Sequence, residues 1–309
     1  MTHPPDRPSE LGAGGDNAIA LTIGTAADEW ALLILRHALQ RGTRRAKDWQ
    51  DLLPITNAVL TARLRHLCDT GVLVQDGEDY LLSPRGIGLW PLMVTVWAWE
   101  AVWAAGYGAE LPAMRHAGCG EHFTPTLVCR TCLAPVAPRD VAAEFGPSGS
   151  WPRSAPNATL RRRSSGSTSL GAGFFPQSRA LIGDRWSAAV LGAAFLGARR
   201  AVEFQRRLGA PATVIADRLR TFRALGVLTA TGDPDRSDRS LYRLTDKGRA
   251  FFPVLMTGLD WGERWFHAPE GPAMLLTHRG ACHPYETLLV CSACAKPLAG
   301  HAIEPVPVD

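Results

Sequence analysis

The sequence has no uninterrupted apolar run long enough to cross a membrane. A spanning helix needs about 20 apolar residues, whereas the most apolar stretch, 89–99, is interrupted by Pro91 and followed by Glu100. Residues 1–18 also lack the hydrophobic core of a signal peptide. We therefore expect a disordered tail over residues 1–18, no contact with a membrane, and a cytoplasmic protein.

Cysteine is scarce, with 7 residues in a chain of 309. Disulfides are rare in the cytoplasm, so these cysteines are expected to be metal ligands or free thiols. The net charge of +4 permits a polyanionic partner without requiring one. A nucleophile beside a base and a phosphate-binding glycine loop are both missing from the sequence. Enzymatic activity is therefore the least favoured function.

A repeated segment dominates what is present. Residues 59–73, VLTARLRHLCDTGVL, return at 214–228 as VIADRLRTFRALGVL. On a helix, each copy places three apolar side chains on one face: Leu60, Leu64 and Leu67, then Ile215, Leu219 and Phe222. The opposite face carries small residues and arginines, and each copy ends at a glycine. This pattern predicts two helices whose outer faces lie against a partner.

The elements around each copy occur in a recurrent order. In the first half, predicted helices over 28–39 and 46–53 precede the repeated helix, and short strands at 72–74 and 80–82 follow it. A long helix over 89–103 closes the unit, and its tryptophans are interpreted as packing residues. Three helices, a two-stranded ribbon and a closing helix form a winged helix-turn-helix, whose third helix enters the major groove of DNA.

The second half restarts the same order, so the repeated unit is about 150 residues long and the chain is a tandem duplication. We predict an α+β fold, mainly α, with two winged helix-turn-helix domains that form an intramolecular pseudo-dimer. A homodimer of two chains is the alternative. Each winged helix-turn-helix domain is followed by a small zinc-ribbon-like module. The predicted divisions are a tail at 1–18, winged helices at 19–107 and 178–268, modules at 108–149 and 269–309, and a flexible linker at 150–177.

Each repeat also carries a histidine, a nearby cysteine and a later Cys-x-x-Cys. The two predicted ligand sets are His116, Cys119, Cys129 and Cys132, and His278, Cys282, Cys291 and Cys294. Three cysteines and one histidine form a recurrent tetrahedral zinc set, so we predict two closed structural zinc sites. His122 and His283 are the competing histidine candidates. A thioredoxin-like redox pair is the alternative for each Cys-x-x-Cys, but the βαβ context of that motif is lacking.

Both halves resemble the HxlR-type winged helix-turn-helix transcriptional regulators of bacteria. The resemblance rests on EWALLILRHAL and DRWSAAVLGAAF, on LTARLRHLCDTGVL and IADRLRTFRALGVL, and on YRLTDKGRAFFPVL followed by WGERW. It implies DNA binding, usually as a symmetric dimer at a promoter, and often repression. We therefore predict a transcriptional regulator, more specifically a repressor, that binds double-stranded DNA in a sequence-specific way. The alternative is a zinc-stabilised protein-interaction module in which the winged helices have lost DNA contact.

The predicted DNA contacts lie on the two repeated helices and on the second ribbon. They are Thr56, Asn57, Thr61, Arg63, Arg65, Thr213, Arg218, Arg220, Arg236, Arg239 and Arg243. Arginine can fork onto guanine edges or phosphate, and threonine allows close approach to a thymine methyl. The alternative is that the arginines are surface charges whose stems cover the core.

The halves differ from each other and from the family pattern. Neither has the cysteine that many members of the family keep ahead of the first helix as a sensor, which argues against thiol sensing by that route. Pro211 replaces the expected N-cap Thr56, and Asp217 stands where the first half has Ala62. The first ribbon is short and acidic, whereas the second contains arginines. We therefore expect an asymmetric DNA site, with half-sites about one helical turn apart.

Overall fold

The computed structural model describes residues 7–104, 111–154, 175–233 and 236–306. Within these ranges it also describes the side chains, except those of residues 233 and 236–239. The first repeat begins with helices whose bounds are α1 Ala18–Ala26, α2 Glu29–Arg41, α3 Ala46–Leu52 and α4 Asn57–Asp69. Strands β2 Leu73–Asp76 and β3 Asp79–Leu82 pair antiparallel, and α5 Pro84–Ile87 and α6 Trp90–Trp103 follow. This is the predicted winged helix-turn-helix order.

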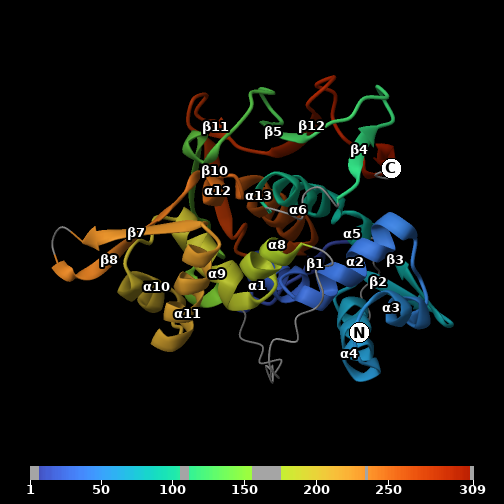
Figure 1. The fold of residues 1–309 in the computed structure, drawn as a ribbon, viewed down its shortest axis with the longest axis horizontal. Coiled ribbons are helices and arrows are strands. Elements are labelled where there is room, and N and C mark those ends of the chain that lie inside the picture. Colours follow the sequence, from blue (N-terminus) through green and yellow to red (C-terminus); the bar gives the residue numbers. More distant parts are fainter. Residues whose placement is uncertain (1–6, 105–110, 155–174, 234–235, 307–309) are drawn as a thin grey trace.

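The second repeat has the same order. Its helices are α8 Pro176–Ile182, α9 Arg185–Phe195, α10 Ala201–Leu208 and α11 Ala212–Ala224. Its ribbon pairs β7 Leu228–Asp233 with β8 Arg236–Leu244, and α12 Asp246–Arg249 and α13 Phe252–Trp265 follow. Figure 1 shows the two winged helices as lobes at either side of the central pair α6 and α13.

The centre of the molecule is a contact between equivalent residues of the two repeats. Helix α6 packs against α13, and the hydroxyls of Thr95 and Thr257 lie 3.2 Å apart across that contact. The indole N–H of Trp99 donates to the Lys247 carbonyl at 3.0 Å, and that of Trp261 donates to the Arg85 carbonyl at 2.9 Å. These reciprocal bonds give the chain the internal two-fold relation expected of a pseudo-dimer.

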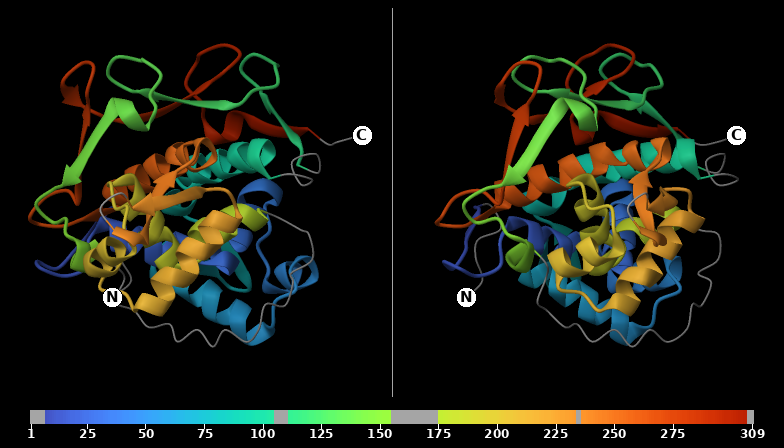
Figure 2. Two further views of the ribbon diagram at one scale, coloured as in Figure 1. Left: turned by 60° about the vertical axis from the view of Figure 1, so that its left-hand side comes forward. Right: turned by 90° about the vertical axis from the view of Figure 1, so that its left-hand side faces the viewer.

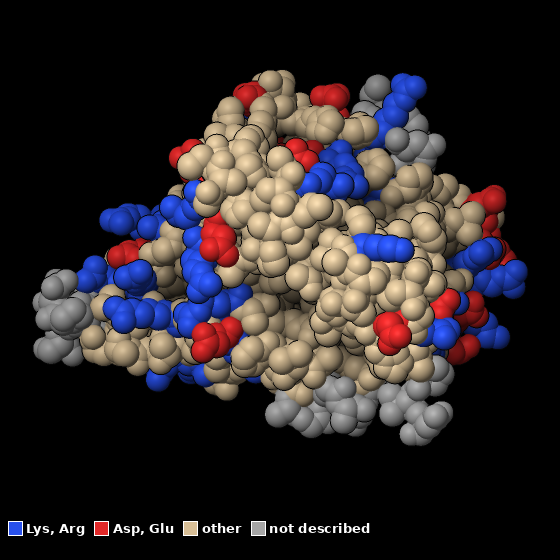
Figure 3. Space-filling model, turned by 90° about the horizontal axis from the view of Figure 1, so that it is seen from above, with Lys and Arg blue, Asp and Glu red and all other residues tan. Residues whose placement is uncertain are grey.

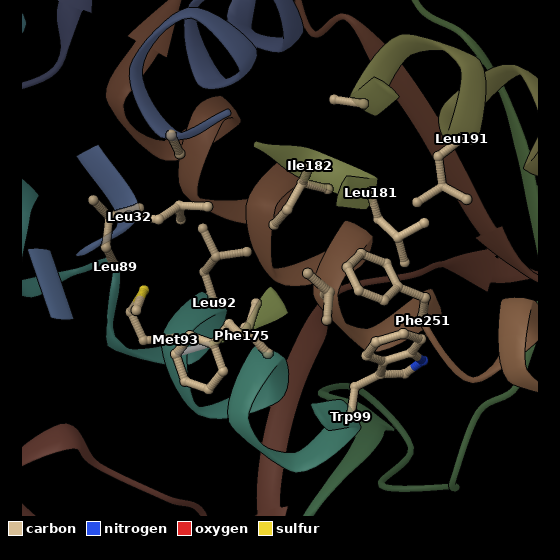
Figure 4. Close-up of a cluster of buried hydrophobic side chains, with 14 of the residues drawn as sticks. Leu32, Leu89, Leu92, Met93, Trp99, Phe175, Leu181, Ile182, Leu191 and Phe251 are labelled. Carbon is tan, nitrogen blue, oxygen red and sulfur yellow. The ribbon is translucent and has the colours of Figure 1, made fainter. Parts of the chain in front are cut away.

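The first helix of each repeat is exchanged onto the closing helix of the other. Helix α1 packs against α13, and α8 packs against α6. The hydrophobic core therefore runs through both repeats. Figure 4 shows Leu181 and Ile182 of the second repeat among side chains that include Leu92 and Trp99 of the first.

The two exchanged contacts differ in chemistry. At the α6–α8 contact, the buried Glu100 carboxylate accepts the backbone N–H of Ser178 at 2.5 Å, and burial raises the pKa of this glutamate. The equivalent position on α13 is Gly262, and Thr22 of α1 lies directly over it. The absence of a side chain at Gly262 therefore allows α1 and α13 to approach closely.

The segments after the two closing helices form one β arch above α6 and α13 (Figure 2). Its strands are β4 Ala113–His116, β5 Pro125–Cys129, β6 Val141–Phe145, β10 Met274–His278, β11 His283–Pro284, β12 Thr287–Cys291 and β13 Ile303–Val306. The ladders β4–β13, β5–β12 and β6–β10 each join one strand from each repeat. The two predicted modules are thus interleaved rather than separate. The boundaries drawn for them remain predictions.

The prediction of a disordered tail over 1–18 is wrong for the residues described. Strand β1 Ser9–Glu10 pairs in parallel with β9 Phe266–His267, and the buried Asn17 caps α1. The unpaired edge of β9 supplies hydrogen-bonding partners that hold this segment. Within the predicted linker 150–177, α7 Trp151–Ser154 is a helical turn and α8 begins at Pro176, whereas 155–174 lie outside the described residues.

Among the described residues, no single helix is both long and apolar enough to span a membrane. Helices α1 and α2 meet that criterion only when taken together, and they are bent by 78° relative to each other.

The close approach of α1 and α13 predicts different effects for two glycines on the same helix. A Cβ at Gly262 would lie 2.1 Å from the Thr22 Oγ1 atom and 3.0 Å from the Ala18 carbonyl oxygen, whereas one at Gly258 would have no neighbour closer than 3.9 Å. We expect Gly262→Ala to lower the free energy of unfolding by about 1–2 kcal/mol through overpacking. Gly258→Ala should be neutral or stabilise by up to about 1 kcal/mol. Urea unfolding of both variants would measure the difference, and equal stabilities would contradict this description of the contact.

Candidate nucleic-acid interface and metal centres

Helix α4 presents a polar surface on its exposed side. Its apolar stripe, Leu60, Leu64 and Leu67, is buried as the spacing predicts. The Thr56 hydroxyl caps the helix by accepting the Val59 N–H at 3.4 Å. The exposed side chains among the predicted contacts are Thr56, Asn57, Thr61 and Arg65. This helix therefore leaves one arginine and three small polar residues free to face a partner.

Helix α11 has the same buried stripe but a different outer face. Pro211 occupies its N-cap position without a side-chain hydrogen bond, and Thr213 and Arg220 are exposed. The Asp217 carboxylate lies 3.0 Å from Arg218 and 3.9 Å from Arg220. Arg220 is 72% exposed at its side chain, so this ion pair contributes little to stability. It does, however, place a negative charge beside the arginine.

Arg63 and Arg218, predicted as flanking DNA contacts, are only partly exposed, and each lies beside an aspartate of its own repeat. The Arg63 guanidinium donates from Nε to Asp28 at 2.8 Å, and their side chains are 15% and 20% exposed. Arg218 lies 3.4 Å from Asp184 in the equivalent way. Both aspartates also cap the helix that follows them, α2 or α9. The first arginine of each Arg-Leu-Arg therefore links two helices of its own repeat. Arg63 links α4 to the start of α2, and Arg218 links α11 to the start of α9.

The two ribbons differ as the sequence predicts. In the first, Asp79 pairs with the exposed Arg45 at 3.2 Å, which neutralises part of its acidic turn. In the second, Arg243 is exposed on β8 opposite Thr229. Arg236 and Arg239 belong to the same strand, but their side chains lie outside the described residues.

One pair of basic residues was not among the sequence predictions. Arg44 and Arg199 are exposed, and their carbonyls accept the backbone N–H groups of Tyr80 and Tyr242 at 2.7 and 2.8 Å. Each arginine therefore lies beside a ribbon. The matching segments GTRRA and GARRA carried this signal in the sequence. From above, Figure 3 shows Lys and Arg gathered at the side of the second winged helix, and a mixture of both charges at the other side.

The cysteines and histidines of the β arch form two clusters. One contains His116, Cys119, Cys291 and Cys294, and the other contains Cys129, Cys132, His278 and His283. Within each cluster, the possible ligand atoms all lie within 4.8 Å of one another. Each cluster thus draws two ligands from each repeat. The predicted grouping, with four ligands from one repeat, is not the arrangement found.

Strand pairing explains this exchange. Strands β5 and β12 are antiparallel, with Cys129 opposite Thr287 and Cys291 opposite Pro125. The two Cys-x-x-Cys turns therefore lie at opposite ends of one ribbon. Strands β4 and β10 end at His116 and His278, and each of these histidines reaches the Cys-x-x-Cys of the other repeat.

The distances within the first cluster fit a tetrahedral ion. Nδ1 of His116 lies 3.5 Å from the Cys119 sulfur and 3.4 Å from the Cys294 sulfur, and the sulfurs of Cys119 and Cys291 are 3.9 Å apart. Zinc bonds of about 2.3 Å to sulfur and 2.0–2.1 Å to nitrogen require ligand separations of about 3.5–3.8 Å. The residues present therefore suit zinc.

The thiols of this cluster differ in acidity. A backbone N–H from Lys296 holds the pKa of Cys294 below its ordinary value. At Cys119, a backbone N–H from Glu121 acts in the same direction, but desolvation and the neighbouring thiols of Cys294 and Cys291 outweigh it and raise the pKa. A dication that replaced the thiol protons would relieve this crowding.

In the second cluster, His283 takes the place predicted for Cys282. Nδ1 of His283 lies 2.8 Å from the Pro284 carbonyl oxygen, so Nδ1 carries the proton and Nε2 is left as a ligand. That Nε2 atom is buried without a partner among the described residues. The Cys282 thiol instead lies 3.6 Å from the Arg279 carbonyl and is exposed. His122, the other alternative, is exposed outside both clusters.

The model of the HxlR-like helix-turn-helix family matches the chain twice, over residues 25–106 and 181–270. The chain belongs to the HxlR-like helix-turn-helix family. This membership confirms the predicted class of protein, a DNA-binding transcriptional regulator and not an enzyme. It also confirms the α+β fold with two such regions in tandem.

Relatives of this HxlR-like chain carry similar names. The chain is 32% identical over 130 residues to an uncharacterised HTH-type transcriptional regulator from Mycobacterium tuberculosis (strain CDC 1551 / Oshkosh). The match covers 41% of this chain and 80% of that relative. A regulator from Mycobacterium bovis, also uncharacterised, has the same identity and coverage. Among solved structures, a candidate transcription factor is 39% identical, covering 43% of this chain and 94% of its own, with a TM-score of 0.39. Another, from Pseudomonas aeruginosa, is 28% identical with a TM-score of 0.31 and covers 38% of this chain and 80% of its own.

The position of Arg63 predicts a loss of stability when it is replaced. Arg63→Ala removes a charged hydrogen bond and leaves the half-buried Asp28 without this partner, so we expect the free energy of unfolding to fall by about 1–3 kcal/mol. The matched control is Arg65→Ala, two residues away and exposed, which should change stability by less than about 0.5 kcal/mol. Chemical unfolding would compare the two. A smaller loss for Arg63→Ala than for the control would show that the ion pair is not structural.

Proposed function

We propose that this regulator is a cytoplasmic repressor that binds one double-stranded DNA site with both recognition helices, α4 and α11. The observation that carries the proposal is that these two helices lie on the same side of the molecule, opposite the β arch (Figure 1). The α6–α13 contact holds them in one body, as in a dimeric helix-turn-helix protein that reads two half-sites about one helical turn apart. Repression is proposed because the family resemblance often implies it.

The two helices are proposed to read their half-sites unequally. Arg65 has no ion pair among the described residues, whereas Arg220 faces Asp217. The second half has instead the more basic ribbon, including the exposed Arg243. We therefore expect α4 to contribute more to base recognition and the second ribbon to contribute phosphate or minor-groove contacts.

The DNA contacts are tested on an operator first recovered by selection from genomic fragments bound by the full chain. Arg65→Ala should weaken binding about 10- to 100-fold, the cost of one good base contact. Arg220→Ala should weaken binding less, because Asp217 already competes for that guanidinium. The matched control is Arg115→Ala, an exposed arginine on β4 paired with Glu304 in the β arch, which should leave the affinity unchanged.

Fluorescence anisotropy at several salt concentrations would measure these affinities. Equal affinities for the wild type and both recognition-helix variants would contradict the proposed interface. Asp217 also favours a second candidate function, a zinc-stabilised interaction protein without DNA contact, because a carboxylate on a recognition helix repels phosphate. Failure of the full chain to show any salt-dependent affinity for duplex DNA would favour that candidate.

We also propose that each cluster of the β arch binds a structural zinc ion. The donor sets and ligand distances support this, and both sets are closed, with four protein ligands. The bound ion would neutralise the thiolates and hold together the strands that carry them. Because each set contains residues of both repeats, the ions would link the two repeats.

Two double variants distinguish zinc ligands shared between the repeats, as found here, from zinc ligands that all come from one repeat. Native mass spectrometry of the full chain should show two zinc ions in the wild type. Cys119→Ser with Cys294→Ser changes a single cluster and should leave one ion, whereas Cys119→Ser with Cys132→Ser changes both clusters and should leave none. If the first double variant kept no ion and the second kept one, the ligands of each zinc ion would instead come from a single repeat.

A second pair of variants tests the ligand at the other cluster. His283→Ala should remove one zinc ion, whereas Cys282→Ala should keep both, because the Cys282 thiol lies outside the cluster. Retention of both ions by His283→Ala would contradict the assignment.

A further inference from the structure

An apolar cavity of about 210 Å³ lies where the two repeats meet. Its walls come from α1 and β6 of the first repeat and from α9, α13 and β10 of the second, with Trp151 of α7 at one side. Most of its lining is aliphatic or aromatic. Cavities of this kind, formed between elements and lined by hydrophobic side chains, are typical small-molecule sites.

The cavity has a specific origin in the duplicated sequence. Where α2 of the first repeat has Leu32, Leu33 and Arg36, the aligned positions of α9 are Ala188, Ala189 and Gly192. All three of the α9 residues line the cavity. A Cβ at Gly192 would meet nothing within 4 Å, which shows open space beside it.

The equivalent region of the first repeat is filled. Leu32 and Leu33 are buried there, and the Arg36 guanidinium packs over the Phe175 ring at 4.9 Å. Phe175 aligns with Ile19, which lines the cavity on the other side of the pseudo-dimer. The cavity therefore lies where small residues of the second repeat align with large residues of the first.

The chemistry of the walls defines the ligand. The Thr22 hydroxyl donates to the Ala18 carbonyl at 2.8 Å, and the Ser154 hydroxyl accepts from Asn17 at 2.9 Å. These polar groups of the lining are thus engaged within the protein, and no charged side chain lines the cavity. A charged ligand would lose its hydration without gaining a partner. An apolar cavity of about 150 Å³ takes up benzene, so this one suits a slightly larger ring system.

We propose that the cavity binds a neutral, apolar small molecule of about two fused rings and that its occupancy changes DNA affinity. Helix α9 both lines the cavity and packs against the recognition helix α11, while α1 of the first repeat forms another wall. A ligand between them therefore contacts the elements that set the position of α11 relative to the first repeat. The effect on DNA rests on the proposed function, whereas ligand binding does not.

Ligand binding is tested with naphthalene by equilibrium dialysis against the full chain. We expect saturable binding of about one molecule per chain, and at least tenfold weaker binding of naphthalene-1-sulfonate, which has the same rings with a charge. Gly192→Leu should fill the cavity and weaken naphthalene binding at least tenfold. The matched control is Gly24→Leu, a helical glycine of α1 outside the lining, where a Cβ also meets nothing within 4 Å.

Ala189→Leu provides a second filling variant, since it restores the residue type of the first repeat, and it decides the matter if Gly192→Leu does not fold. The proposal is overturned by absence of saturable naphthalene binding, by equal binding of the sulfonate, or by undiminished binding in a folded filling variant.

The effect on DNA is measured separately, as operator affinity with and without naphthalene. A shift of about fivefold or more in the wild type, absent in the filling variant, is expected. A chain that binds naphthalene and DNA without such a shift overturns the regulatory part. If the chain binds naphthalene but no DNA, the proposed function and the effect on DNA are both overturned, whereas the ligand site is supported.

Discussion

Helices α6 and α13 meet through Thr95 and Thr257 at the centre of the molecule, and each also receives the first helix of the opposite repeat. The remaining architecture depends on this arrangement. It buries the two closing helices on several sides, places the recognition helices on one side of the molecule, and brings the two following segments close enough to interleave. A change in the α6–α13 contact would therefore alter the recognition helices and the β arch together.

Covalent duplication frees the two halves from the constraint that identical subunits impose. In a symmetric dimer, a substitution appears on both sides of the axis. Here the two repeats differ at equivalent positions, with Glu100 in the first repeat and Gly262 in the second, Leu33 and Ala189, and Arg36 and Gly192. In the second half, Ala189 and Gly192 therefore line a cavity at positions where the first half has larger side chains. The unequal recognition faces fit the same pattern of independent change.

The features predicted correctly from the sequence are those that depend on local spacing. Leu60, Leu64 and Leu67 recur at the helical period, so their burial follows from short-range geometry. The role of Arg63 was less accessible, because its partner Asp28 lies 35 positions away and joins it only through the packing of α4 on α2. Helical spacing places Arg63 at the edge of the apolar face of α4, but it does not show that another helix packs against that edge.

The sequence could not show which cysteines and histidines share a cluster, and the reason is different. In a duplicated chain, ligands within one repeat and ligands shared between repeats have the same residue types and the same local spacing. The antiparallel pairing of β5 with β12 decides between them. Likewise, the ordering of Ser9 and Glu10 depends on the edge of β9, more than 250 residues later.

The exchange of α1 onto α13 has a consequence for the order in which the protein can be built. The first repeat emerges from the ribosome before α13 has been translated, so the face of α1 that packs against α13 is still uncovered while the first winged helix forms. His116 and Cys119 likewise precede Cys291 and Cys294, the other members of their cluster, by more than 150 residues along the chain. The first repeat therefore cannot complete its fold until the segment of the second repeat that carries Cys291 and Cys294 has been translated.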